Sequence, residues 1–189
     1  MTLRLFQHNE VMWTPEDAKA LAGTYLGQDS DRWQHVRAVA SVAHELVAAG
    51  APLDLEMAAW LHDIGYADPL ARTGMHALDG ARFLELVEAP PIVVGLVAFH
   101  TGAEFEADER GLLGKLLEFE RPVQPLLDQL ILADMLSGPR GERVSVSRRL
   151  GDIFARYGPE HPVHRAVSLS GPYLRLASER ASAAAGYPI

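Results

Sequence analysis

The 189-residue chain contains no cysteine. Disulfides, thiolate zinc sites, iron–sulfur clusters and cysteine nucleophiles are therefore excluded, and any metal must be bound through nitrogen and oxygen. Such ligands favour iron, manganese or magnesium, or zinc in a histidine–carboxylate site. No stretch reaches about 18 consecutive apolar residues, so we expect no membrane span. The N-terminal segment also lacks the apolar core of a signal peptide, and we expect a cytoplasmic location.

Positive charge is also scarce, because 17 Lys and Arg stand against 25 Asp and Glu and give a formal net charge of -8. This balance argues against a nucleic acid polymer or an anionic membrane as partner, since both require a basic surface. It still allows a small phosphorylated substrate such as a nucleotide, because metal ions and a few arginines can reverse the field locally. The 48% hydrophobic content is typical of a globular domain.

Apolar residues recur with helical spacing almost throughout, which predicts an all-α, single-domain helical bundle. The metal-site core should span about 14–157, with a C-terminal helical extension over 159–189. Residues 1–11 are interpreted as an upstream extension before an alternative start at Met12. We expect helices over about 14–26, 30–50, 54–65, 77–88, 92–101, 122–136 and 146–157. A short helix is expected near 112–119 in an otherwise irregular 102–121 segment, and a last helical stretch from about 162, broken at Gly171-Pro172.

Four of the eight histidines lie in or at the ends of apolar helices, in order with two aspartates. Asp134 lies within Leu-Ile-Leu-Ala-Asp-Met-Leu, where a buried carboxylate needs a cation, a cap or a strong donor. His62 and Asp63 are adjacent at a helix end and could converge on one ion. Taken singly, His35 and His100 could equally be ordinary core histidines, and His76 could cap a helix.

Together these residues resemble the HD superfamily of metal-dependent phosphohydrolases. The resemblance is carried by His35-Val36-Arg37-Ala38-Val39-Ala40, Leu61-His62-Asp63-Ile64-Gly65 and Ala133-Asp134. It implies an HD-type bundle in which one or two divalent ions activate a water that attacks a nucleotide or another small phosphate ester. Iron or manganese is favoured, with magnesium, zinc, nickel and cobalt as alternatives.

His76 and His100 match the two-metal subgroup of that superfamily. The resemblance then implies that Asp63 bridges the ions, with His35, His62 and Asp134 on one ion and His76 and His100 on the other. Asp63 would also be catalytic by orienting the nucleophilic water. Many two-metal members carry Lys after the HDIG segment, whereas this chain has Tyr66.

Substrate contacts are less well marked in the sequence. The main candidates are Arg72, Thr101, Arg140 and Arg148, and Arg121 and Arg149 are further candidates. Exposed arginines are usually solvated, however, and Thr101 could simply cap a helix. His8, His44, His161 and His164 are discounted. One alternative function is a mixed-valence diiron oxygenase of the HD type. That branch uses a tyrosine and a glutamate before the first histidine, and this chain has Tyr25 and Gln28 there. Another alternative is a non-catalytic nucleotide-sensing module.

Overall fold

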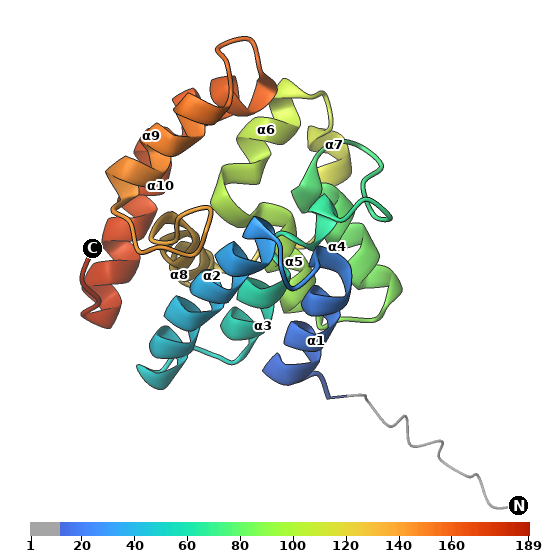
Figure 1. The fold of residues 1–189 in the computed structure, drawn as a ribbon, viewed down its shortest axis with the longest axis vertical. Coiled ribbons are helices and arrows are strands. Elements are labelled where there is room, and N and C mark those ends of the chain that lie inside the picture. The colour runs from blue at the N-terminus through green and yellow to red at the C-terminus, as the bar shows by residue number, and fades with distance from the viewer. Residues whose placement is uncertain (1–11) are drawn as a thin grey trace, which may run out of the picture.

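The computed structural model describes residues 12–189, and these residues form an all-α single domain, as the periodicity predicts (Figure 1). Within them, the only β geometry is one isolated bridge between Ser137 and Arg143. Nor does any of their helices combine the length and the hydropathy that crossing a membrane requires. The predictions for residues 1–11 lie outside the described residues. The helices are α1 (Pro15–Leu26), α2 (Asp31–Ala48), α3 (Asp54–Leu61), η1 (Ile64–Tyr66), α4 (His76–Leu86), α5 (Pro91–Phe99), η2 (His100–Gly102), α6 (Ala103–Glu109), α7 (Leu113–Leu116), α8 (Gln124–Met135), α9 (Val146–Arg156) and α10 (Pro162–Ala185).

The helix starts follow local capping chemistry. Thr14 caps α1: its hydroxyl accepts a hydrogen bond from the Asp17 amide, and the Asp17 carboxylate accepts one from the Thr14 amide. This reciprocal pair satisfies amides that the first helical turn leaves without partners. The Ser30 side chain similarly accepts from the Trp33 amide and fixes the start of α2. The register of α2, on which the first histidine lies, is thus set at its first turn.

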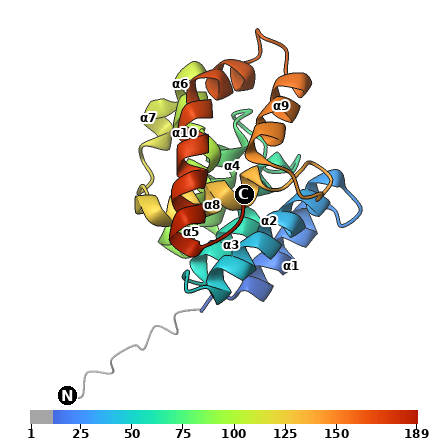
Figure 2. The same ribbon diagram turned by 90° about the vertical axis from the view of Figure 1, so that its left-hand side faces the viewer.

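Helix α3 lies at the centre of the bundle, packed against α1, α2, α5 and α8. Most of its side chains are buried, including the fully buried Leu55 and Leu61. Burial of each such leucine contributes about 1.5–3 kcal/mol. Helices α9 and α10 form an antiparallel pair, and α10 covers α8 (Figure 2). This packing gathers the ends of α3, α5 and α8, the first turn of α4 and the N-terminal half of α2 on one side of the core.

Two expectations about helices were wrong. Gly171-Pro172 does not break the last helix, because α10 runs without interruption across Pro172. Buried residues continue on both sides of the proline, among them Val167 and Leu174, so tertiary packing outweighs the backbone hydrogen bond that proline cannot donate. The segment 102–121 is also more regular than predicted, since it contains α6. That helix buries only Ala103 and Ala107, and so short an apolar stripe is hard to see among acidic residues.

Candidate metal centre

The His62-Asp63 pair lies where α3 ends. His62 is the C-cap, and Asp63 leaves the helical conformation with φ -100° and ψ 7° before the short turn η1 begins. Gly65 in that turn packs directly on the first turn of α4: a Cβ there would lie 2.0 Å from the His76 carbonyl oxygen and 2.6 Å from the Gly80 amide nitrogen. Only glycine permits this approach. The approach brings the first residue of α4, His76, next to Asp63.

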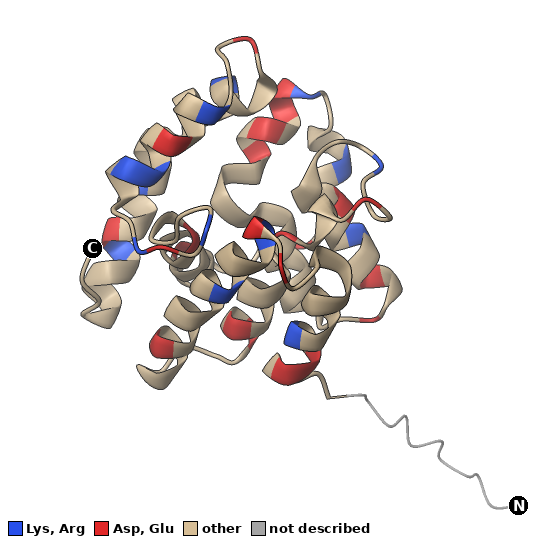
Figure 3. Ribbon diagram, in the orientation of Figure 1, with Lys and Arg blue, Asp and Glu red and all other residues tan. Residues whose placement is uncertain are grey.

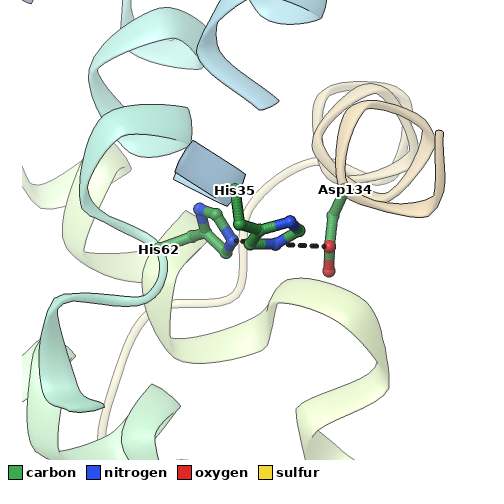
Figure 4. A group of neighbouring side chains, drawn as sticks. All are labelled: His35, His62 and Asp134. Atoms are coloured by element: carbon green, nitrogen blue, oxygen red, sulfur yellow. Dashed lines mark hydrogen bonds and ion pairs between the residues drawn. The ribbon is translucent and has the colours of Figure 1, made fainter. Parts of the chain in front are cut away.

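One group of ligand atoms comes from α2, α3 and α8. His35 Nε2 lies 3.1 Å from Asp134 Oδ1 and 3.4 Å from His62 Nε2 (Figure 4). All three side chains are buried, and their ligand atoms lie within 4.8 Å of one another. Asp63 turns its Oδ2 toward this first triad, at 3.5 Å from His62 Nε2 and 3.7 Å from His35 Nε2.

A second triad consists of Asp63, His76 and His100, again with ligand atoms within 4.8 Å of one another. Here Asp63 uses its other oxygen: Oδ1 lies 3.4 Å from His76 Nε2 and 4.0 Å from His100 Nε2. The two imidazole nitrogens are 3.0 Å apart. A single carboxylate therefore faces both triads, one oxygen toward each, which is the arrangement that a bridging ligand requires.

Three of the histidines have their tautomer set by the backbone. The Nδ1 atoms of His35, His62 and His100 lie 3.0, 2.8 and 2.7 Å from the carbonyl oxygens of Gly138, Ala59 and Val97, respectively. Because a carbonyl only accepts, each Nδ1 must donate its proton there. The Nε2 lone pairs therefore point into the site, as in metal-binding histidines whose other nitrogen donates to a carbonyl or carboxylate.

Arginines supply the positive charge that the two buried carboxylates need. Burial alone would raise the pKa of Asp63, but the adjacent Arg32, which donates to Oδ2, and the surrounding histidines hold that pKa well below its usual value. Burial would also raise the pKa of Asp134, but the nearby Arg149 and His35 have a larger effect and hold this pKa well below its usual value. Arg149 Nη2 lies 3.1 Å from Asp134 Oδ1. Both aspartates are thus ionised at neutral pH.

His62 and His76 are kept neutral. Burial lowers the pKa of His62 to about 4 and holds the pKa of His76 well below its usual value, in spite of the nearby Asp63 charge. A neutral imidazole is the form that binds metal. The ring of His76 is also stacked on the ring of Tyr66, with 4.0 Å between the ring centroids. The Arg32 guanidinium lies over the Tyr66 ring, 3.9 Å from its centroid.

Thr101 occupies an unusual backbone conformation beside the site. Its φ of 48° is left-handed, which is an outlier for a β-branched residue and is retained only where the surroundings enforce it. Its hydroxyl donates to Asp134 Oδ2, so the strained turn that follows His100 links the end of α5 to α8. Thr101 also lines a cavity at the site.

One cavity is lined by residues of both triads, and a second cavity shares three arginines with it. The first, about 80 Å³, is called the metal-side cavity and includes among its lining residues Asp63, His76, His100, Asp134, Thr101, Glu106, Tyr157, Arg32, Arg149 and Arg156. The second, about 260 Å³, is called the arginine cavity and is lined by Asp31, Arg32, Pro139, Arg140, Arg149 and Arg156. Of the predicted substrate contacts, Thr101 and Arg140 therefore line a cavity, whereas Arg72 and Arg148 line neither.

Sequence reasoning missed Arg32 and Arg156. Arg32 lies three residues before His35, one helical turn away on the same face of α2, and this spacing was a usable signal. The discounted histidines of the described part line neither cavity: His44 is exposed and hydrogen-bonded to Glu56, and His164 bonds the Tyr157 carbonyl. His8 lies outside the described residues.

The donor set suits a divalent metal pair. Four imidazoles and two ionised carboxylates converge, and two pairs of Nε2 atoms approach to 3.4 and 3.0 Å. In the His35–His62 pair both Nε2 lone pairs face each other, because both Nδ1 atoms donate to carbonyl oxygens. A cation between these two nitrogens would relieve the repulsion of their lone pairs, and the donor set matches the ligands of divalent first-row metals. The molecule is therefore an all-α protein with a candidate histidine–carboxylate metal site.

The HD domain family model matches residues 32–137, more than half of the chain, and the chain belongs to the HD domain family. The match includes all six ligand candidates, from His35 to Asp134. A comparison with curated proteins and a comparison with solved structures found no match. Proteins of this family are generally metal-dependent phosphohydrolases, and a metal-dependent hydrolytic function is what the family and the His/Asp cluster together support.

Proposed function

We propose that this protein is a metal-dependent phosphohydrolase that uses a water nucleophile against a nucleotide or another small phosphate ester. The observation that carries the proposal is the position of the Asp63 carboxylate between the two triads. Its Oδ2 lies 3.5 Å from His62 Nε2, and its Oδ1 lies 3.4 Å from His76 Nε2. It gives each triad one negative oxygen and makes a two-ion centre the natural occupant. Family membership supports the hydrolytic chemistry.

In this proposal the six ligand candidates hold two divalent ions: His35, His62 and Asp134 one of them, His76 and His100 the other, with Asp63 shared. When bound, such ions lower the pKa of a coordinated water and neutralise charge on a phosphoryl group. Asp63 is the proposed catalytic residue, because a carboxylate oxygen between the triads can accept a hydrogen bond from the attacking water and so orient it.

Arg32 and Arg149 are placed to neutralise substrate charge. In the structure their guanidinium groups contact Asp63 and Asp134, respectively, and both line the metal-side cavity. A guanidinium beside the reacting phosphoryl group stabilises the charge that develops on its oxygens. The buried walls of the cavity, which include Ile153 and Val167, limit the access of bulk water and strengthen these interactions.

No contact among residues 12–189 favours the oxygenase alternative. Tyr25 packs against Phe83, with ring centroids 4.8 Å apart, and within residues 12–189 neither Tyr25 nor Gln28 lines a cavity at the triads. Tyr25 and Gln28, which precede the first histidine as the tyrosine and glutamate of the oxygenases do, therefore do not line the candidate centre.

The decisive experiment pairs metal analysis of protein purified without chelator with a phosphate-release screen over nucleotides and phosphomonoesters, in air and under anaerobic conditions. We expect one to two equivalents of iron, manganese or a similar ion, and phosphate release that does not depend on oxygen. Oxygen consumption without phosphate release would contradict the proposal in favour of an oxygenase. A bound nucleotide that stays unchanged after long incubation with metal-loaded protein would instead indicate a sensing module.

A further inference from the structure

The arginine cavity is strongly positive although the protein carries a net charge of -8. It receives Arg32 from α2, Arg149 and Arg156 from α9, and Arg140 from the turn between α8 and α9, with Asp31 as its one acidic residue. Figure 3 shows the basic segments along α9, opposite the acidic α6. Among residues 12–189, the arginines that form ion pairs do not include Arg140 and Arg156. These two positive charges therefore line the cavity without a close ion pair in the described part of the chain, although Glu142 lies near Arg140, and backbone hydrogen bonds and the Arg140 charge both lower the pKa of Glu142.

The turn that carries Arg140 is fixed to α2 and is not a free surface loop. Gly141, at φ 83°, approaches α2 so closely that a Cβ would lie 2.8 Å from the Gln34 carbonyl oxygen. The Gly138 carbonyl in the same turn accepts the His35 Nδ1 proton. The backbone that presents Arg140 is therefore held in register with the first triad.

Arg149 gives an independent indication of a ligand. Its side chain is only 8% exposed, and its Nη2 contacts Asp134, but its Nε is buried without a hydrogen-bond partner in the described residues. A buried donor without an acceptor is unfavourable, and such a group in a native structure calls for an explanation. An anionic oxygen in the adjoining cavity would satisfy it, since guanidinium groups bind phosphate through two donors at once.

The two cavities share Arg32, Arg149 and Arg156, so they adjoin each other across these three side chains. We propose that the arginine cavity binds one phosphate of a substrate with at least two phosphates in a phosphoanhydride chain, while the neighbouring phosphate lies at the triads. The inference rests on the proposed function and narrows its substrate class from phosphate esters in general to phosphoanhydrides. A nucleoside polyphosphate and an inorganic polyphosphate both carry this chemistry.

The reaction is then hydrolysis of one phosphoanhydride bond. The water oxygen bonds to the phosphorus at the triads, and the bond from that phosphorus to the bridging oxygen breaks. The electron pair stays on the leaving phosphate, and a proton of the water passes to solvent. The leaving phosphate gains negative charge as the bond breaks, and Arg140, Arg149 and Arg156 lie where they stabilise that charge.

The first test measures binding alone and needs no metal. Protein is stripped with a chelator, which is then removed by dialysis, and is titrated calorimetrically with inorganic triphosphate and with orthophosphate. We expect triphosphate to bind at least about tenfold more tightly, because each charge-assisted contact to an arginine corresponds to about tenfold to 100-fold in affinity. Arg140→Gln and Arg156→Gln should each weaken triphosphate binding about tenfold. Both arginines are exposed, so neither change threatens the fold.

Arg37→Gln is the matched control, since Arg37 is an exposed arginine of α2 outside both cavities, and its triphosphate affinity should stay within about twofold of wild type. Equal affinity for orthophosphate and triphosphate, or unchanged triphosphate binding in the Arg140 and Arg156 variants, would overturn the inference.

The second test compares kcat/KM of metal-loaded protein for a nucleoside triphosphate, inorganic triphosphate and the monophosphate of the same nucleoside. Arg140→Gln and Arg156→Gln should each lower the value about tenfold for a triphosphate. Arg140→Gln, which changes a residue of the arginine cavity alone, should leave the value for the monoester within about twofold. Preference for either triphosphate supports the inference and identifies the source of the anhydride. Efficient monoester hydrolysis that is preferred over both triphosphates refutes the inference but leaves the proposed function intact. Release of phosphate from none of the substrates refutes the proposed function itself.

Discussion

Replacement of Asp63 by asparagine probes the centre most directly, because one side chain faces both triads. Asparagine keeps the shape of the side chain and removes the charge. Replacement of residues that merely hydrogen-bond a metal ligand lowers metal affinity about 10–100-fold. Loss of a ligand shared by two ions should therefore lower the affinity for each ion by at least about 100-fold. The loss of several kcal/mol of charge stabilisation corresponds to a decrease in kcat/KM of about 10³-fold or more.

Stability has to be separated from metal binding in this experiment. Asp63→Asn leaves Arg32 without its carboxylate, but the Arg32 side chain is 27% exposed and can turn toward water, so we expect a loss of only about 1–2 kcal/mol in the free energy of unfolding. Asp128→Asn is the matched control. Asp128 is a buried carboxylate that binds Arg180 through two contacts of 2.7 Å and lines neither cavity.

The assay combines metal content by elemental analysis, phosphate release and denaturant unfolding of the wild type and both variants. Asp128→Asn should unfold more easily than wild type but keep its metal and its turnover, whereas Asp63→Asn should lose both. If Asp63→Asn retained two equivalents of metal and a kcat/KM near that of wild type, the bridging role assigned to this carboxylate would be wrong.

Three further predictions concern how the site is held. Gly65→Ala should lower the free energy of unfolding by about 3 kcal/mol or more, measured in denaturant, because its Cβ would meet the His76 backbone at 2.0 Å. Asp79→Ala should cost about 2–3 kcal/mol in the same assay, because the buried carboxylate accepts from the amide and the hydroxyl of Thr73 and fixes the loop before α4; unchanged stability would contradict this role. Metal-free protein should become less stable as pH falls from 6.5 to 4. Burial lowers the pKa of His62 from 6.5 to about 4, so only the unfolded chain takes up that proton in this range, and calorimetry should show a loss of up to about 3 kcal/mol. A melting temperature independent of pH over that window would count against a neutral, buried His62.

Much of the candidate centre could be predicted from sequence because its six residues lie in or at the ends of helices and together resemble the HD superfamily. Buried polar groups need partners, and the order His, His-Asp, His, His, Asp is the pattern that carries the resemblance. The structure brings all six together in two groups of three. Their roles as ligands remain a prediction that metal analysis has to test.

The arginines were harder to predict, because local sequence says little about which arginine is buried. Arg148 and Arg149 are adjacent, yet Arg148 is exposed and Arg149 is 7% exposed. The apolar residues of α9 hold the signal: Val146, Leu150 and Ile153 are buried, and a period of 3.6 residues places position 149 on their face and position 148 beside it. Read with this period, the sequence favours Arg149 over its neighbour.

The helix over 103–109 and the unbroken α10 depend on tertiary contacts that no local pattern contains. Gly171-Pro172 is a strong local breaker, and only packing against α8 and α6 explains why the helix continues through it. The predicted C-terminal extension is also part of the site's surroundings, since Val163 and Val167 of α10 line the metal-side cavity. The domain limits of 14–157 and 159–189 remain a prediction.

The contacts of the imidazole Nδ1 atoms have a consequence for how the centre can vary among related sequences. His35, His62 and His100 are aligned by main-chain carbonyls and not by side chains of other residues. A carbonyl is present whatever residue occupies the position, so substitutions at Ala59 or Val97 that preserve the helix ends leave ring orientation unchanged. The helical backbone thus sets the orientation of these imidazole rings. Substitutions of the surrounding side chains can then change substrate preference without changing the orientation of the rings.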